Sequence, residues 1–177
     1  MDINQRNADY KDRYYKEVDT RFKIEAGLKT SPALFLIVFA LLAYIFKLTI
    51  AVNIYPQYYW FWGLFASSVI SLVIAVFFFA AAIHGYTYSQ IPTPVELENY
   101  YKTTLEHYAK YDLSKAKQYA GETFEEYINE CYIVFATQNT LNNDTKLLNL
   151  SRIHRFIIIA FFLASFTYIP LYAWILK

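Results

Sequence analysis

Side chains that could support catalysis or bind a metal ion are few in this chain and lie far apart. His84, His107 and His154 show no metal-ligand spacing with one another or with Cys131. The sequence has no glycine-rich phosphate loop, no serine nucleophile elbow and no HExxH helix. The acidic residues between 96 and 130 follow the pattern of solvated helix faces. We therefore expect no enzyme, no metal site and no cofactor.

Tyrosines are the side chains that stand out between residues 96 and 135. We predict that Tyr100, Tyr101 and Tyr127 belong to the core and interface of a small helical domain. Gln138 and Asn142 are further interface candidates on the following helix. In the alternative interpretation, some of the rings stack on a planar ligand such as a nucleotide base.

The composition indicates a protein of the membrane rather than a nucleic-acid binder. The chain has 177 residues, of which 56% are hydrophobic and 20% aromatic, and its net charge is +1. This charge excludes bulk nucleic-acid binding. The single cysteine, Cys131, excludes an internal disulfide and is expected to be buried. Since the first thirty residues are densely charged, we expect no cleavable signal peptide, so the first span must direct insertion.

The helices that position these side chains are predicted from apolar runs. Trp60 to Ile83 is a run of 24 residues without a charge, and no Asp, Glu, Lys or Arg occurs from Leu48 to Val95. At about 1.5 Å per residue this run reaches roughly 36 Å, enough to cross a hydrocarbon core of about 30 Å. It is predicted to be the second of three spans, near 33–52, 60–83 and 156–176.

The first two spans carry the candidates for helix packing or for lining a pore. Lys47 is the only charge in the first span and shares a face with Ala43 and Ala51. It is expected to extend to the nearer membrane interface; the alternative is a lysine that faces a pore or a partner. In the second span, Gly63, Ser67 and Ser71 recur every four residues, a spacing that lets helices pack closely or lets serines line a pore.

The region before the first span is predicted to be an amphipathic helix over residues 1–30. Tyr10, Tyr14, Val18 and Phe22 recur every four residues and share one face. Gly27 is expected to break this helix. Ser31 is then predicted to cap the following helix, and Pro32 to be the first residue of that helix.

Two further helices and a stalk are predicted after the second span. Thr93-Pro94-Val95-Glu96 has the pattern of a capping box with proline at the first helical position. Residues 113–121 are expected to form a connection, and Thr123 to open the next helix. Because no glycine occurs from 123 to 175, that helix is predicted to run as a stalk into the third span.

Basic residues and aromatic residues predict the orientation independently. Lys and Arg precede the first and third spans, whereas the 53–59 loop has none. The positive-inside rule therefore places the N-terminus and residues 85–155 in the cytoplasm and the C-terminus outside. Tyr172 and Trp174 would then join an outer aromatic belt formed by the aromatic residues of 55–62.

These observations predict an all-α integral membrane protein with three transmembrane helices, a cytoplasmic helical region and a long stalk helix that continues into the third span. The expected parts are a cytoplasmic amphipathic helix at 1–30, a transmembrane hairpin at 31–84, a cytoplasmic helical domain at 85–152 and a third span at 153–177.

A family resemblance rests on short motifs spread over most of the chain. After the tyrosine-rich first helix and the hairpin come Ile91-Pro92-Thr93-Pro94, Tyr100-Tyr101 and Phe124-Glu125-Glu126-Tyr127. This layout resembles small bacterial membrane proteins of unassigned role, some of which resemble membrane effectors of antiviral defence loci. The resemblance implies a bacterial inner-membrane effector and no catalytic residues.

Two functional hypotheses follow. In the first, a homo-oligomeric inner-membrane effector receives a cytoplasmic protein or a small nucleotide signal, and its spans permeabilise or depolarise the bilayer. In the second, the chain is a non-conducting membrane anchor or accessory subunit that holds its cytoplasmic helices beside a partner. Oligomeric state together with ion flux distinguishes the two.

Overall fold

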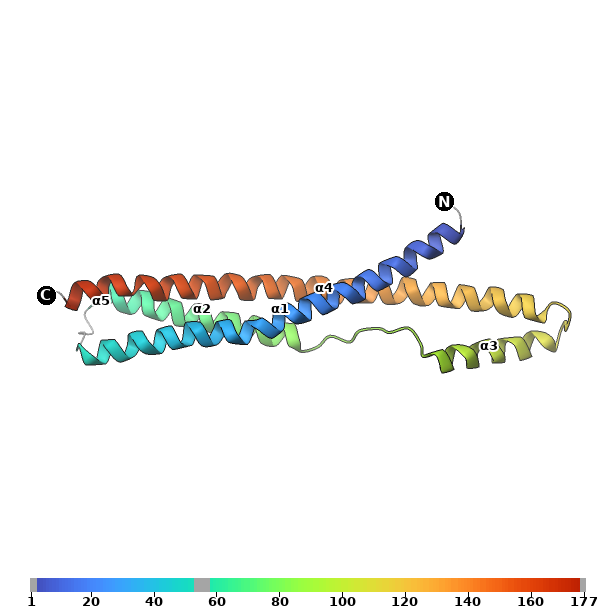
Figure 1. Cartoon of the computed structure of the whole chain (residues 1–177), viewed down its shortest axis with the longest axis horizontal. Helices are drawn as coiled ribbons and strands as arrows, with labels where there is room; N and C mark the ends of the chain where they lie inside the picture. Colours follow the sequence, from blue (N-terminus) through green and yellow to red (C-terminus); the bar gives the residue numbers. More distant parts are fainter. Residues whose placement is uncertain (1–2, 53–57, 176–177) are drawn as a thin grey trace. The chain divides into compact units, whose positions relative to one another are not determined.

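The computed structural model describes residues 3–52 and 58–175, and every regular element in these ranges is a helix. The helices are, in chain order, α1 (Ile3–Ala51), α2 (Tyr59–Ile83), α3 (Pro94–Ala109), α4 (Ala116–Phe166) and α5 (Tyr168–Ile175) (Figure 1). This confirms the prediction of an all-α chain for the part that the structure describes.

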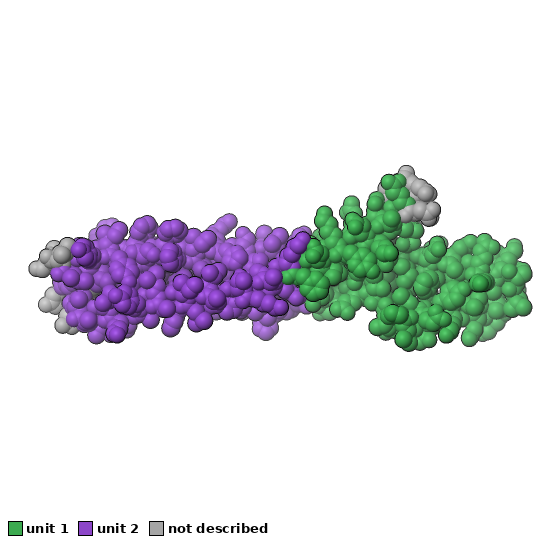
Figure 2. Space-filling view, viewed as in Figure 1, with its two compact units in different colours: residues 1–22, 87–143 green, residues 23–86, 144–177 purple. Residues whose placement is uncertain are grey.

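The chain divides into two compact units, which are coloured separately in Figure 2. Residues 1–22 and 87–143 form the first, here called the polar unit because it holds most of the charged side chains. Residues 23–86 and 144–177 form the second, here called the span unit. Helices α1 and α4 each contribute residues to both units.

Three helical stretches are long and apolar enough to cross a membrane, as the sequence predicted. They belong to Gln5–Ala51, Tyr59–Ile83 and Ala116–Ile175. Most of their apolar side chains are exposed, including Ile37, Ile70 and Phe162. Exposure of this kind over a full span is the pattern of helices solvated by lipid rather than by water.

The interior of the span unit is filled with small and branched side chains. Ile45 of α1, Ala75 of α2 and Ala160 of α4 are completely buried. The hydroxyl of Ser68 donates to the Ala160 carbonyl over 2.7 Å, a bond between α2 and α4 that needs close backbone approach. Phe35 packs edge-on against Phe79, which joins α1 to α2 in the same unit.

Aromatic side chains from two distant parts of the sequence meet in the span unit. The rings of Tyr58 and Trp174 lie 5.6 Å apart, and the Trp174 indole donates to the Val52 carbonyl over 3.4 Å. Tyr59 and Trp60, at the start of α2, are 78% and 81% exposed. Of the aromatic residues that the sequence assigns to one belt, Tyr58 and Trp174 are in contact, and Tyr55 lies outside the described residues.

The predicted break between residues 27 and 32 is wrong. Helix α1 runs through Gly27, Ser31 and Pro32 without ending. The hydroxyls of Thr30 and Ser31 both donate to the Gly27 carbonyl, so side-chain bonds support the backbone beside the proline. Gly27 serves packing instead, because a Cβ there would lie 2.8 Å from a methyl carbon of Leu150.

The predicted start of the next helix at Thr123 is also wrong. Helix α4 begins at Ala116 and contains Gly121, so the connection is shorter than expected. A local turn precedes it, in which the Asp112 carboxylate accepts from the Ser114 amide and hydroxyl. Both bonds lower the pKa of Asp112, and the bond from the hydroxyl has the larger effect. The Thr123 hydroxyl pairs with Tyr108 over 3.1 Å rather than capping a helix.

The predicted capping box at the start of α3 is confirmed. The Thr93 hydroxyl accepts from the Glu96 amide, and the Glu96 carboxylate accepts from the Thr93 amide over 2.7 Å. The bond from the Thr93 amide is the main reason why the pKa of Glu96 is lowered. The stability that this carboxylate contributes is therefore present above its ordinary pKa and is lost as the pH falls through the lowered value.

The predicted continuity of the long helix with the third apolar run is confirmed, but the run itself is interrupted at Thr167. Helix α4 has 51 residues and is continuous through Asn142 and Asn143 to Phe166. It ends there because Pro170 has no N–H to donate to the Phe166 carbonyl. Thr167 lies between α4 and α5, where its hydroxyl donates to the Ala164 carbonyl.

Candidate functional site

The most specific arrangement of polar groups in the chain surrounds an extended segment of the polar unit. Residues Thr87–Thr93, here called the connector, follow α2 and precede α3 and have no helical or strand structure. Gly85, with φ of 89°, ends the α2 helix just before this segment and adopts a conformation that favours glycine. The backbone groups of the connector must therefore find their partners elsewhere.

Asn139 of α4 supplies two of those partners. Its side-chain oxygen accepts from the Ser89 amide and its side-chain nitrogen donates to the Ser89 carbonyl, both over 3.1 Å. The amide side chain thus pairs with the connector as a neighbouring β-strand would. Asn139 is only 2% exposed, so the pair is shielded from water.

Two neighbouring asparagines on α4 extend this contact. Asn142 donates to the Thr87 carbonyl over 2.7 Å. Asn143, which is also 2% exposed, accepts from the Tyr88 hydroxyl over 2.9 Å. The Asn143 nitrogen donates to the backbone carbonyl and the carboxylate of Glu17, each over 2.8 Å. Asn143 therefore joins the connector, α1 and α4 at one point.

Helix α1 holds the connector from its other side. The Tyr14 hydroxyl accepts from the Ile91 amide over 3.3 Å. The Arg21 guanidinium lies 4.3 Å from the centre of the Tyr88 ring, within the range of a cation–π contact. The connector is thus held by side chains of α1 and α4 rather than by backbone pairing.

An open groove of about 590 Å³ lies beside the connector within the polar unit. Tyr14, Tyr15 and Tyr132 form an aromatic cluster in it, with ring centres 5.4 to 6.4 Å apart. Burial is the first cause that raises the pKa of Tyr132, followed by its contact with Tyr15.

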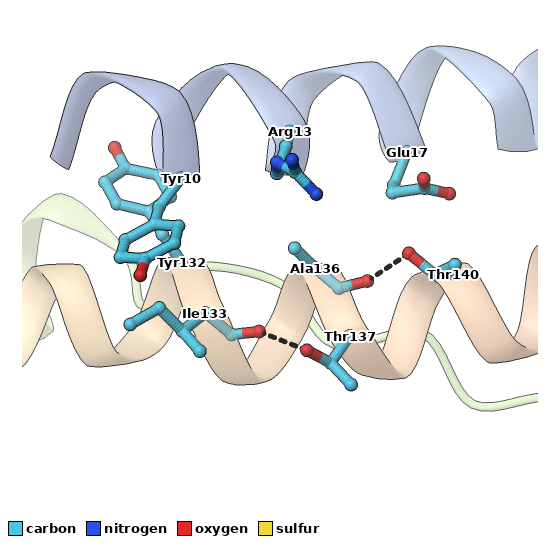
Figure 3. Close-up of a pocket in the computed structure, with 8 residues that line it drawn as sticks. All are labelled: Tyr10, Arg13, Glu17, Tyr132, Ile133, Ala136, Thr137 and Thr140. Atoms are coloured by element: carbon cyan, nitrogen blue, oxygen red, sulfur yellow. Dashed lines mark hydrogen bonds between the residues drawn. The ribbon is translucent and has the colours of Figure 1, made fainter. Parts of the chain in front are cut away.

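A smaller hollow of about 270 Å³ lies between α1 and α4 (Figure 3). Tyr10 and Arg13 enter it from α1, and Tyr132 enters it from α4. The two threonine hydroxyls along its wall are already bonded to carbonyls of their own helix, Thr137 to that of Ile133 and Thr140 to that of Ala136. The Tyr10 and Tyr132 rings, the Arg13 guanidinium and the Glu17 carboxylate also line the hollow, and this carboxylate already accepts from the Asn143 side-chain nitrogen.

The predicted tyrosine interface connects α3 to α4. Tyr100 stacks on Tyr127 with ring centres 4.2 Å apart, and Tyr101 meets Phe124 edge-on at 5.8 Å. Burial is the main cause that raises the pKa of Tyr127. These half-buried rings pack against each other between α3 and α4, whereas the rings beside the connector border the open groove.

Gln138 and its neighbours form an exposed strip on α4. Gln138 is exposed, unlike Asn139, and Val134 and Leu141 on the same face are 51% and 61% exposed. Residues three and four apart share a helix face, so Val134, Gln138 and Leu141 make one continuous surface, here called the α4 strip.

The span candidates separate into exposed and buried residues. Lys47 is exposed on α1, and Gly63 and Ser67 are exposed on α2, where a Cβ at Gly63 would meet nothing within 4 Å. Ser71 is buried, and its hydroxyl donates to the Ser67 carbonyl over 2.9 Å. Of the three small residues, Ser71 therefore packs within the chain, whereas Gly63 and Ser67 remain exposed on the helix surface.

Among the described residues, no three His, Cys, Asp or Glu side chains come close enough to hold a metal ion. Cys131 is buried, as expected, and the acidic residues of 96–130 are all exposed. Comparisons with protein-family models, curated proteins and solved structures gave no match to this chain.

Asn139, Asn143 and Arg21 are site residues that the sequence did not predict. Part of this site could have been recognised from the sequence. Asn139, Asn142 and Asn143 lie close together in a helix without a break, which is unusual for a stalk. The sequence alone does not identify the hydrogen-bond partner of Asn139, because Ser89 lies 50 residues away along the chain.

Proposed function

We propose that this protein is a homo-oligomeric effector of the bacterial inner membrane with a role in antiviral defence. Its polar unit receives a signal, and its spans permeabilise or depolarise the bilayer. One observation carries the proposal: the α4 strip exposes Val134 and Leu141 in the unit outside the apolar spans. Lipid does not account for apolar side chains there, and a second copy of α4 would cover them.

The signal is proposed to act at the connector. Residues 87–91 are held by side-chain amides and a tyrosine hydroxyl, which another ligand or protein can replace. The adjoining groove offers tyrosine rings and Arg21, groups suited to an aromatic or anionic ligand such as a small nucleotide, or to a protein segment. Displacement of the connector would change the restraint on α1 and α4, which also supply two of the spans.

The conducting path is proposed to run between copies rather than through one chain. Buried apolar groups such as Ile45, Phe61 and Ile153 fill the interior of the span unit. Lys47 lies instead on an exposed face of α1 with Ala40 and Ala43. Small exposed residues on α1 and α2 would let neighbouring chains approach closely.

A non-conducting anchor or accessory subunit is the second candidate. The apolar interior of the span unit favours it, since the described residues of this interior form one hydrophobic cluster. To distinguish the two functions, we would determine oligomeric state in nanodiscs and measure ion flux from liposomes with the same preparation. A monomer without flux would establish the anchor and reject the effector.

The Lys47 series tests the conducting path. If Lys47 lines it, Lys47→Glu should shift the reversal potential under a salt gradient towards cations, because a ring of like charges repels ions of its own sign. Lys47→Gln should weaken selectivity without changing assembly. Identical reversal potentials in the wild type and both variants would remove Lys47 from the path and leave it as an interfacial lysine.

The proposed topology has the N-terminus and the polar unit in the cytoplasm and the C-terminus outside. In a Cys131→Ala background, an impermeant thiol reagent added to intact cells should label Tyr59→Cys and spare Ser114→Cys. Both positions are exposed, so access depends on the side of the membrane. After lysis both should react, which controls for folding, and the reverse pattern in intact cells would overturn the orientation.

A further inference from the structure

A further groove lies in the span unit, and its lining differs from that of the groove beside the connector. It has a volume of about 590 Å³ and runs between α1 and α4. Leu34, Ile37 and Val38 form its α1 wall. Four apolar side chains of α4 form the other wall, which consists of Ile157, Ile158, Phe161 and Phe162. Only the end of the groove is polar, where Thr30 and His154 contribute to the lining.

The dimensions of this groove match one leaflet of a bilayer. From His154 to Phe162 the α4 wall covers nine residues, and the eight steps between them span about 12 Å at 1.5 Å per residue. One half of a hydrocarbon core of about 30 Å is about 15 Å. If the three helices cross the bilayer, as their length and apolar character indicate, an acyl chain lying in the groove would place its headgroup near His154.

Charge at the polar end favours an anionic headgroup. Arg155 follows His154, is exposed, and lies on the same face of α4 as Ile158 and Phe162 of the groove. Lys29 adjoins Thr30 and is also exposed. A guanidinium and an imidazole N–H are good donors to phosphate oxygens, and basic pockets between membrane helices bind anionic headgroups.

We propose that this groove binds an anionic phospholipid, with one acyl chain along Ile37 and Ile158 and the phosphate at His154 and Arg155. The site is separate from the connector and does not depend on whether the protein conducts. It would fix α1 against α4 at the membrane surface, next to the contact of Gly27 with Leu150.

Native mass spectrometry of the full chain in detergent tests this site, with phosphatidylglycerol and phosphatidylcholine as probes. The wild type should retain phosphatidylglycerol in preference. Arg155→Gln should weaken its binding roughly tenfold, the effect of losing one charge-assisted hydrogen bond. Ile158→Trp, which fills the groove, should abolish retention, and millimolar inorganic phosphate should not displace the lipid.

Two matched variants serve as controls. Arg152→Gln removes the same charge from α4, but Arg152 lies over the Phe78 ring instead of the groove. Ile70→Trp enlarges an equally exposed span residue of α2. Both should retain phosphatidylglycerol, with helicity checked by circular dichroism in every variant. Equal retention of the two lipids, an equal loss in Arg152→Gln, or full retention in Ile158→Trp would each overturn the proposal.

Discussion

Replacing Asn139 by alanine is expected to release the connector while the helices remain folded. The substitution leaves the amide and the carbonyl of Ser89 without their partners. Loss of partners for part-buried polar groups costs about 1 to 3 kcal/mol, which corresponds to a roughly fivefold to 150-fold increase in local opening. Hydrogen exchange of the peptide containing residues 86–93 should therefore accelerate by that factor.

The neighbouring glutamine provides a control for this experiment. Gln138 is exposed on the same turn of α4, so Gln138→Ala should leave exchange of the connector unchanged. Peptides from α3 and from the start of α2 should exchange as in the wild type with either substitution. Unchanged protection of the connector in Asn139→Ala would mean that its backbone is not held by the asparagine, and the proposed signalling contact would fail with it.

How far the sequence predicts this fold depends on the range over which the causes act. Apolar length identified the three long helices, and the capping box of Thr93 and Glu96 is local chemistry that acts within one turn. Gly27 was misjudged because its role is set by Leu150, a residue 123 positions later. From the sequence, a glycine that allows close packing cannot be distinguished from a glycine that ends a helix unless the residue packed against it is known.

The candidate site shows the same limit. Tyr100, Tyr127 and their neighbours were recognised as packing residues because aromatic side chains are numerous in the sequence around α3. The pairing of Asn139 with Ser89 was not predicted, because an asparagine in a helix has no preferred distant partner. Gln138 and Asn139 are adjacent and chemically similar, yet one is exposed and the other is buried. Only the helix orientation separates their roles.

The substitution expected to change assembly most is Val134→Lys combined with Leu141→Lys in the α4 strip. Burying a valine or leucine side chain contributes about 1.5 to 3 kcal/mol, so losing two such contacts per chain should raise the dissociation constant more than a hundredfold. The added lysines would also repel each other across the contact. Multi-angle light scattering and cross-linking in nanodiscs should show a smaller species, and flux should fall with assembly.

A matched control shows whether the effect on assembly is specific to the α4 strip. Val95→Lys with Leu113→Lys introduces the same two residue changes at positions of the polar unit that are 69% and 81% exposed but lie off the strip. This control should assemble as the wild type does. Gln138→Leu should act in the opposite direction, since a polar residue within an apolar helix contact reduces its stability. If the strip variant keeps the wild-type assembly, α4 faces solvent or another protein at this strip, and the contact between copies must be sought on the small exposed faces of α1 and α2.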